Sequence, residues 1–112
     1  MALFRVGPLP DAALAAAARF HGEVLPRVLA ELARGENLVL VFAPADHTHR
    51  GWRLAVVQQL AREHAPLRVN ALAADDDAAV AAAEAYLASA PGVTGQYLPL
   101  DGNGAGGLLS RV

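Results

Sequence analysis

Short apolar runs alternate with helical stripes along this chain. Four runs have the length of β-strands: 2–6, 38–43, 67–73 and 95–100. Between them lie three stretches in which apolar residues recur at three- and four-residue steps, as on one face of a helix: 12–33, 51–64 and 78–90. The pattern therefore predicts four strands that alternate with three helices.

Such alternation is typical of an α/β fold in which right-handed crossovers join parallel strands. We expect a small Rossmann-like fold of three layers, with about four mostly parallel strands and three helices. The run 38–43 is continuously apolar, as required of a strand buried on both faces. A sheet of this size is half of a doubly wound domain, so a sheet edge or a helical face should need a covering partner.

Proline and glycine refine this outline. Pro26 lies inside the first helical stretch, where its missing N–H predicts a kink near Gly22. Pro99 lies in the last apolar run, which favours an edge position for that strand. No linker or internal repeat divides the sequence, so we expect a single domain over 1–112, with 103–112 as a flexible tail.

Composition excludes several classes of function. The 112 residues carry a net charge of −2, which argues against nucleic-acid binding, and all nine basic residues are arginine. There is no cysteine, which excludes disulfides and thiolate chemistry, and no lysine that could form a Schiff base. No stretch approaches the ~20 apolar residues of a membrane span, and no signal peptide is evident, so we expect a cytoplasmic protein that binds no membrane.

The polar stretch after the second strand carries the main candidate ligand residues. They are Asp46, His47, His49 and Arg50. Ligands of open α/β sheets bind beyond the carboxyl ends of the strands, and two imidazoles with a carboxylate could hold zinc. Alternatively, Asp46 or Thr48 caps the next helix and the histidines are solvated. We favour the second interpretation and expect no metal, no cofactor and no catalytic residue.

The segment 102–107 matches the dinucleotide motif G-x-G-x-x-G letter by letter. Only five residues follow it, so no helix can present its N-terminus to a pyrophosphate. We therefore expect no dinucleotide site there.

The second half of the chain resembles the short-chain dehydrogenase/reductase family. Residues 54–71 are similar to that family's helix after the catalytic Tyr, followed by its "RVNA" strand, here 68–71. Residues 94–102 are similar to its C-terminal "TGQ…DGG" strand, and 87–89 to a preceding "LAS" phrase. The stretches 25–29 and 38–42 resemble its long central helix and the strand before its catalytic Ser. The resemblance covers only the C-terminal half of the family fold.

The family's catalytic and cofactor motifs have no counterpart here. Asp46 and Arg50 occupy the positions of the catalytic Tyr and Lys, and the Ser position falls near Ala43 or Pro44. Residues 73–77 replace the segment that holds nicotinamide, and the glycine-rich turn of the missing half is absent. The resemblance therefore implies that hydride transfer on the family pattern is lost.

Family members commonly form dimers through the helices that correspond to 11–34 and 51–64, or through the last helix and strand. The resemblance thus implies a homodimer, with these interface candidates: Leu25, Val28, Trp52, Val56 and Leu60. We expect a non-catalytic protein that acts through a homo-oligomer or a protein partner. The alternatives are a small-ligand or nucleotide-binding module that uses the loops 43–50, 73–77 and 101–107, or an enzyme with a new site at Asp46, His47 and His49.

Overall fold

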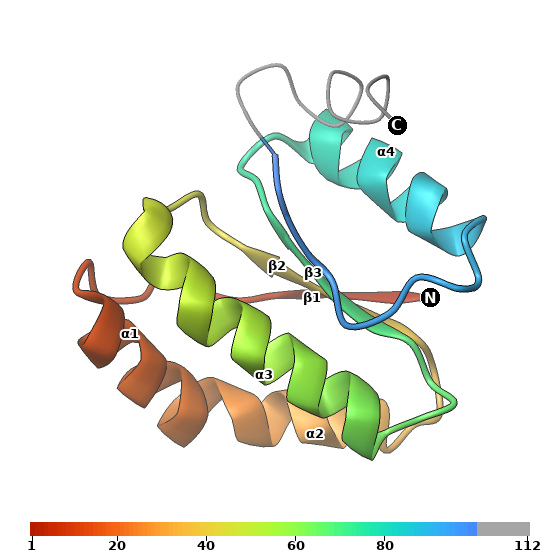
Figure 1. Cartoon of the computed structure of the whole chain (residues 1–112), viewed down its shortest axis with the longest axis horizontal. Coiled ribbons are helices and arrows are strands. Elements are labelled where there is room, and N and C mark those ends of the chain that lie inside the picture. Colours follow the sequence, from red (N-terminus) through yellow and green to blue (C-terminus); the bar gives the residue numbers. More distant parts are fainter. Residues whose placement is uncertain (101–112) are drawn as a thin grey trace.

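A computed structural model, which describes residues 1–100, shows one sheet of four parallel strands (Figure 1). The strands are β1 (Ala2–Arg5), β2 (Leu38–Phe42), β3 (Val69–Ala73) and β4 (Tyr97–Pro99). They lie in the order β1-β2-β3-β4, so each new strand adds to the same side of the sheet. The predicted parallel sheet is confirmed, and Pro99 lies on an edge strand as expected. The expected tail lies outside the described residues.

Helices cover both faces of this sheet and give the predicted three layers (Figure 1). The connection from β1 to β2 is one long helical arm built of α1 (Ala13–Arg19), η1 (Phe20–Val24) and α2 (Leu25–Leu32). The short helix η2 (His47–His49) leads into α3 (Arg50–Glu63), and α4 (Asp77–Ala88) precedes β4. Among the helices of residues 1–100, none combines the length and hydropathy needed to cross a bilayer.

The predicted kink in the long arm takes the form of a π-helical turn. This turn, η1, contains Gly22 and ends just before Pro26, which lies in the first turn of α2. In a regular α-helix the Pro26 ring would clash with the carbonyl of Gly22, and Pro26 has no N–H to donate to it. The wider turn shifts the hydrogen-bond register at this point, so the arm continues as a helix in spite of the proline.

Strand β2 lies at the centre of the hydrophobic core. All five of its residues are buried, because alternate side chains point to opposite faces. Leu38, Leu40 and Phe42 pack against the side of α2 and α3, whereas Val39 and Val41 pack against the side of α4. The continuous apolar run is therefore explained by burial on two faces.

The last connection differs from the expectation that all crossovers are right-handed. The arm and α3 cross one face of the sheet, but α4 crosses the other, while β4 still adds on the same side as β3 did (Figure 1). The connection from β3 to β4 therefore has the opposite hand to the two before it. For this crossover the prediction is wrong, because hand follows from the face that the helix covers, which the alternation of elements does not specify.

Side-chain hydrogen bonds from Arg68, just before β3, and from Asn70 within β3 hold this unusual connection in place. Arg68 donates from Nη1 to the carbonyl oxygens of Leu87 and Ala90, at 2.8 and 2.9 Å, and so binds the C-terminal end of α4. The fully buried Asn70 donates to the Val93 carbonyl and accepts from the Gln96 amide, both at 3.0 Å.

Two further hydrogen bonds complete this set of contacts, the β3–β4 clasp, which joins Arg68, Val69 and Asn70 to residues 87–96. The Val69 amide donates to the Thr94 hydroxyl at 3.0 Å, and the Gly95 amide donates to the Val69 carbonyl at 2.7 Å. Gly95 has a φ of +73°, and a Cβ there would lie 3.6 Å from the Cβ of Ala61. The "RVN" and "TGQ" phrases of the sequence thus have a structural role, since Val69 and Asn70 bind the "TGQ" residues and Arg68 binds the end of α4.

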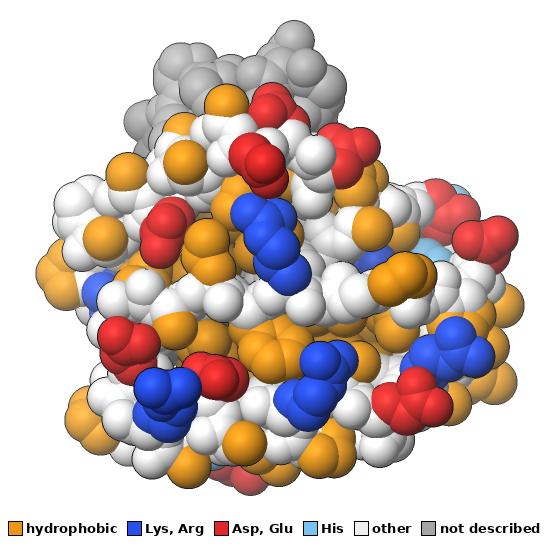
Figure 2. Space-filling model, turned by 180° about the vertical axis from the view of Figure 1, so that it is seen from behind, with side chains coloured by type: hydrophobic (Ala, Val, Ile, Leu, Met, Phe, Trp, Pro, Cys, Tyr) orange, Lys and Arg blue, Asp and Glu red, His pale blue; other side chains and the backbone are white. Residues whose placement is uncertain are grey.

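The outer edge of β1 carries no further strand within the described residues. Leu3 on this edge is 37% exposed, and the Arg27 guanidinium lies 5.5 Å from the centre of the half-buried Phe4 ring. Figure 2 looks onto this side and shows hydrophobic side chains in a band between arginine and acidic side chains. The stacked arginine covers part of an otherwise open edge, and a charge placed there discourages strand addition.

We expect Asn70→Ala to destabilise the fold by about 1–3 kcal/mol, because it removes the buried side chain that binds the Val93 carbonyl and the Gln96 amide. Urea unfolding followed by circular dichroism would measure the change. Ser89→Ala, which removes an exposed bond to the Tyr86 carbonyl, is the matched control. It should change stability by less than about 0.5 kcal/mol. Equal effects of the two substitutions would contradict the role given to Asn70.

Candidate functional site

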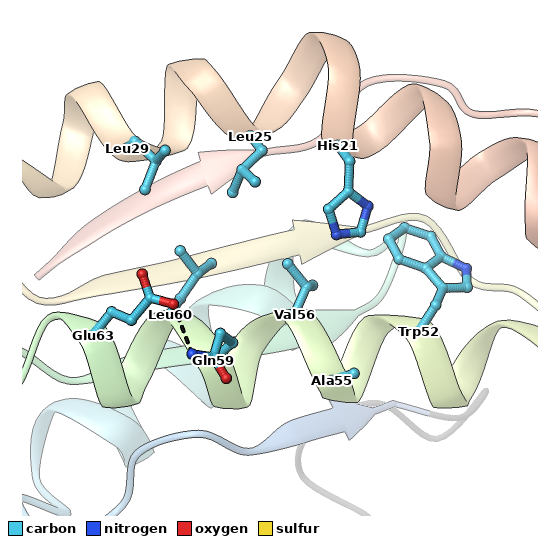
Figure 3. A pocket seen from close by; sticks show the side chains of 9 residues that line it. All are labelled: His21, Leu25, Leu29, Trp52, Ala55, Val56, Gln59, Leu60 and Glu63. Carbon is cyan, nitrogen blue, oxygen red and sulfur yellow. Dashed lines mark hydrogen bonds between the residues drawn. The ribbon is translucent and has the colours of Figure 1, made fainter.

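An open apolar groove runs between the helical arm and α3. It encloses about 470 Å³. Leu25 and Leu29 line it from the arm, while Trp52, Val56 and Leu60 line it from α3 (Figure 3). Leu29 is 41% exposed, so a large apolar side chain meets solvent at the groove's rim. The helices pack on the sheet with their inner faces and leave this outer seam uncovered.

Four of the five interface residues expected from the sequence line this groove. Val56 and Leu60 lie deep in it, at 7% and 5% exposed, and Leu25 and Trp52 are half-buried. Val28 does not belong to this surface. It is fully buried against the sheet, because it lies on the inner face of α2.

The two ends of the groove differ in chemistry. At one end the exposed His21 ring lies 6.5 Å from the Trp52 ring, and its Nδ1 is 2.8 Å from the Ala17 carbonyl oxygen. At the other end the Glu63 carboxylate accepts a hydrogen bond from the side-chain amide of Gln59, with 2.7 Å between Nε2 and Oε2 (Figure 3). The groove therefore has an imidazole at one end and a carboxylate at the other.

The loop after β2, expected as the ligand loop, has a structural role in this fold. Asp46 caps η2, where its carboxylate accepts from the Thr48 amide at 3.0 Å and also from the Thr48 hydroxyl. These two hydrogen bonds, the hydroxyl bond most of all, lower the pKa of Asp46 below its usual value. The capping interpretation is therefore confirmed for Asp46, whereas His47 and Arg50 are exposed to solvent.

His49 is buried, contrary to the solvated position expected of it. It is 5% exposed, and its Nε2 lies 2.8 Å from the Asp11 carbonyl oxygen. Its Nδ1 accepts a hydrogen bond from Trp52 Nε1 at 3.2 Å. Because a carbonyl can only accept, this pairing fixes the tautomer protonated on Nε2. Both ring nitrogens are occupied, so His49 fastens the start of α3 to the loop before α1 and is not free to bind a metal.

No group of three or more residues that could hold a metal ion occurs within 1–100. His47 is exposed and His49 is buried in other bonds, so the two imidazoles do not face a common point. The proposed enzyme site at Asp46, His47 and His49 is therefore not assembled in this structure.

Arg53 is a buried polar residue that the sequence interpretation missed. It is 3% exposed, and its Nη1 donates to the Ala43 carbonyl at 2.9 Å and to the Tyr97 hydroxyl at 3.0 Å. Its guanidinium lies 4.5 Å from the centre of the Phe42 ring. The spacing in the sequence could have indicated that Arg53 is buried, because position 53 shares a helical face with Val57 and Leu60.

A second, smaller cavity lies beside Arg53. It encloses about 240 Å³ between the loops that lead from β1 into α1 and from β2 into η2. Arg53, His49 and Phe42 line it together with three prolines, Pro8, Pro10 and Pro44. The cavity thus opens at the carboxyl ends of two neighbouring parallel strands, where α/β sheets bind ligands.

Comparison with known families adds one match. A family model described as "short chain dehydrogenase-like protein" matches residues 4–100. No curated protein and no solved structure matches the chain. The match covers the whole described part of the chain apart from its first three residues, and it supports the resemblance found in the sequence.

We expect Asp46→Ala to lower the melting temperature at neutral pH, since the variant loses the acceptor for Thr48. The lowered pKa of Asp46 means that its ionised form stabilises the fold above the usual carboxyl value of 3.8. That contribution is lost as the pH falls through the lowered pKa of the folded state. The difference in melting temperature between the two proteins should therefore shrink in acid. Thermal melts across this pH range test it, with the exposed Asp75→Ala as control, and a difference that persists in acid would contradict the role of the ionised cap.

Proposed function

Because this chain belongs to the short chain dehydrogenase-like family, we propose that it keeps the family's means of assembly without the family's chemistry. In this proposal it acts as a non-catalytic protein that pairs with a second copy through the groove between the helical arm and α3. The observation that carries the proposal is the open apolar seam, whose two walls are the helices through which the family commonly forms dimers. The cytoplasmic location expected from the sequence is part of the proposal.

The state of the former catalytic positions supports a non-catalytic role. Asp46, at the position of the Tyr, is ionised near neutrality and is held by Thr48, so it cannot act as a phenolic acid. Arg50, at the position of the Lys, is exposed. Neither Ala43 nor Pro44, near the Ser position, has a hydroxyl group. These substitutions remove the proton donor, the cation and the hydroxyl on which the family's hydride transfer depends.

The chemistry of the groove favours a second copy as its occupant. A twofold axis across the middle of the groove would place the His21 end of one copy over the Glu63 end of the other, which pairs an imidazole with a carboxylate at both ends. The same axis would place the exposed Leu29 of each copy against the other's apolar wall. One surface would thus supply both halves of the interface, as a symmetric dimer requires.

A partner of a different kind would be expected to bring its own complementary charges. In a homodimer, the His21 end of one copy pairs with the Glu63 end of the other, so this chain alone supplies both groups. We therefore prefer a homodimer to an unknown partner. The alternative function, binding of a small ligand at the loops after the strands, is supported by a separate observation, the cavity beside Arg53.

Leu29→Asp should convert the dimer into a monomer, because it places a charge on the exposed apolar rim without disturbing the core. Trp52 and Leu60 are less suitable, since both also pack against the core of the monomer. Native mass spectrometry of the full chain, with sedimentation equilibrium, measures the outcome. Leu14→Asp is the matched control: Leu14 is 86% exposed on α1 and lies outside the groove.

The expected pattern is a dimer for the wild type and for Leu14→Asp, and a folded monomer for Leu29→Asp. A monomeric wild type, or a dimer that survives Leu29→Asp, would overturn the choice of this groove.

A further inference from the structure

Arg53 is a buried cation that no acidic group pairs within the described residues. The partners of its Nη1 are a carbonyl and a phenol, both neutral. Its Nε is the one buried side-chain nitrogen or oxygen atom in residues 1–100 without a hydrogen-bond partner. Arginine is almost never fully buried without a paired anion, because desolvation of an isolated charge is costly. The aromatic faces around the guanidinium offset part of this cost, but they accept no hydrogen bond comparable to that of a carboxylate.

The cavity beside Arg53 has room for a small anion with an apolar body. Its volume of about 240 Å³ exceeds that of a bare ion, and apolar and polar surface share its wall almost equally. His49 also lies on the wall, but both its nitrogens are already bound. Arg53 is therefore the principal cationic group that the cavity presents.

The wall also indicates which anion fits. Pro8, Pro10 and Pro44 have no N–H group, so they interrupt the run of successive backbone donors on which phosphate sites depend. A carboxylate has two oxygens, which a guanidinium can bind through paired N–H donors. Asp11 is the acidic residue on the wall, but it is exposed, so water and salt screen its charge from an anion at Arg53.

We propose that this cavity binds a small carboxylic acid, as its carboxylate, with the charged head at Arg53 and the apolar body against the prolines and Phe42. This site is independent of the groove between the arm and α3, which lies on the outer side of the helices. The bound carboxylate supplies the counter-charge that Arg53 lacks in the described part of the chain.

Titration of the full chain with sodium butyrate, followed by amide chemical shifts in nuclear magnetic resonance, tests this. Butyrate should shift the backbone amides of Leu9, Asp11, Ala43 and Ala45 at millimolar concentration. Butyramide, which has the same shape without the charge, and sodium chloride of equal ionic strength should not. Shifts of equal size with butyramide or chloride, or shifts confined to the groove, would overturn the proposal.

Two variants connect the binding to this cavity. Arg53→Met should weaken butyrate binding about tenfold or more, because it removes the charge-assisted hydrogen bonds. Arg50→Met is the matched control, since it removes an exposed charge one helical turn away and should leave the affinity within about twofold. Ala45→Leu fills the cavity from an exposed loop position and keeps Arg53 intact, so it tests the site even if Arg53→Met does not fold. Butyrate affinity unchanged by Ala45→Leu would show that the cavity is not the site.

Discussion

The clasp between β3 and β4 is the interaction on which the last third of the molecule depends. The twist of the strands favours right-handed crossovers between parallel strands. A crossover of the opposite hand lacks this contribution to its stability. Here Asn70 binds the backbone on both sides of Thr94 and Gly95, while Arg68 binds the end of α4. These bonds fix the loop that reverses direction between α4 and β4. Since α4 covers Val39, Val41 and Leu72, the clasp also decides whether the second face of the sheet is buried.

The elements that follow from local sequence were predictable, and those that follow from tertiary placement were not. The run at 38–42 could only be a strand buried on two faces, and Pro26 with Gly22 located the distortion in the arm to within a few residues. The hand of the last crossover was not predictable, because α4 is apolar and small enough to pack on either face. The limits of the strands were shorter than the apolar runs, since Leu67 and Arg68 lead into β3 and Gly95 turns toward β4.

The candidate site shows the same division. Asp46 as a cap followed from residue type and position alone. The burial of His49 and Arg53 did not, because it depends on partners distant in sequence: the Asp11 carbonyl for His49 and the Tyr97 hydroxyl for Arg53. A polar residue on an apolar helical face indicates that a buried partner exists, but the sequence pattern does not identify that partner. The candidate interface residues were predicted as a group, although only the structure separates the groove-lining Val56 from Val28, which lies wholly within the core.

The residues that match the family's phrases lie apart from the residues at the positions of its catalytic groups. Val69 and Asn70 of the "RVN" phrase bind the "TGQ" residues beside β4. The positions of the family's catalytic groups lie instead in the loop after β2 and at the start of α3. The residues that hold the last strand in place are therefore distinct from those at the catalytic positions, as expected where function depends on sites carried by a scaffold. In this chain the loop after β2 caps η2 and forms part of the wall of the Arg53 cavity.

Trp52 contacts both the groove between the arm and α3 and the residues around the Arg53 cavity. Its ring lines the groove, its Nε1 binds His49 on the wall of the cavity, and the Arg53 guanidinium lies 5.8 Å from its ring. A change at Trp52 would therefore disturb the groove, the fastening of α3 and the surroundings of Arg53 together, and its effect could not be assigned to any one of them. Leu29 and Ala45 each contact only one of the two surfaces. Variants at these two positions can thus separate assembly from ligand binding, because Leu29 does not line the cavity and Ala45 does not line the groove.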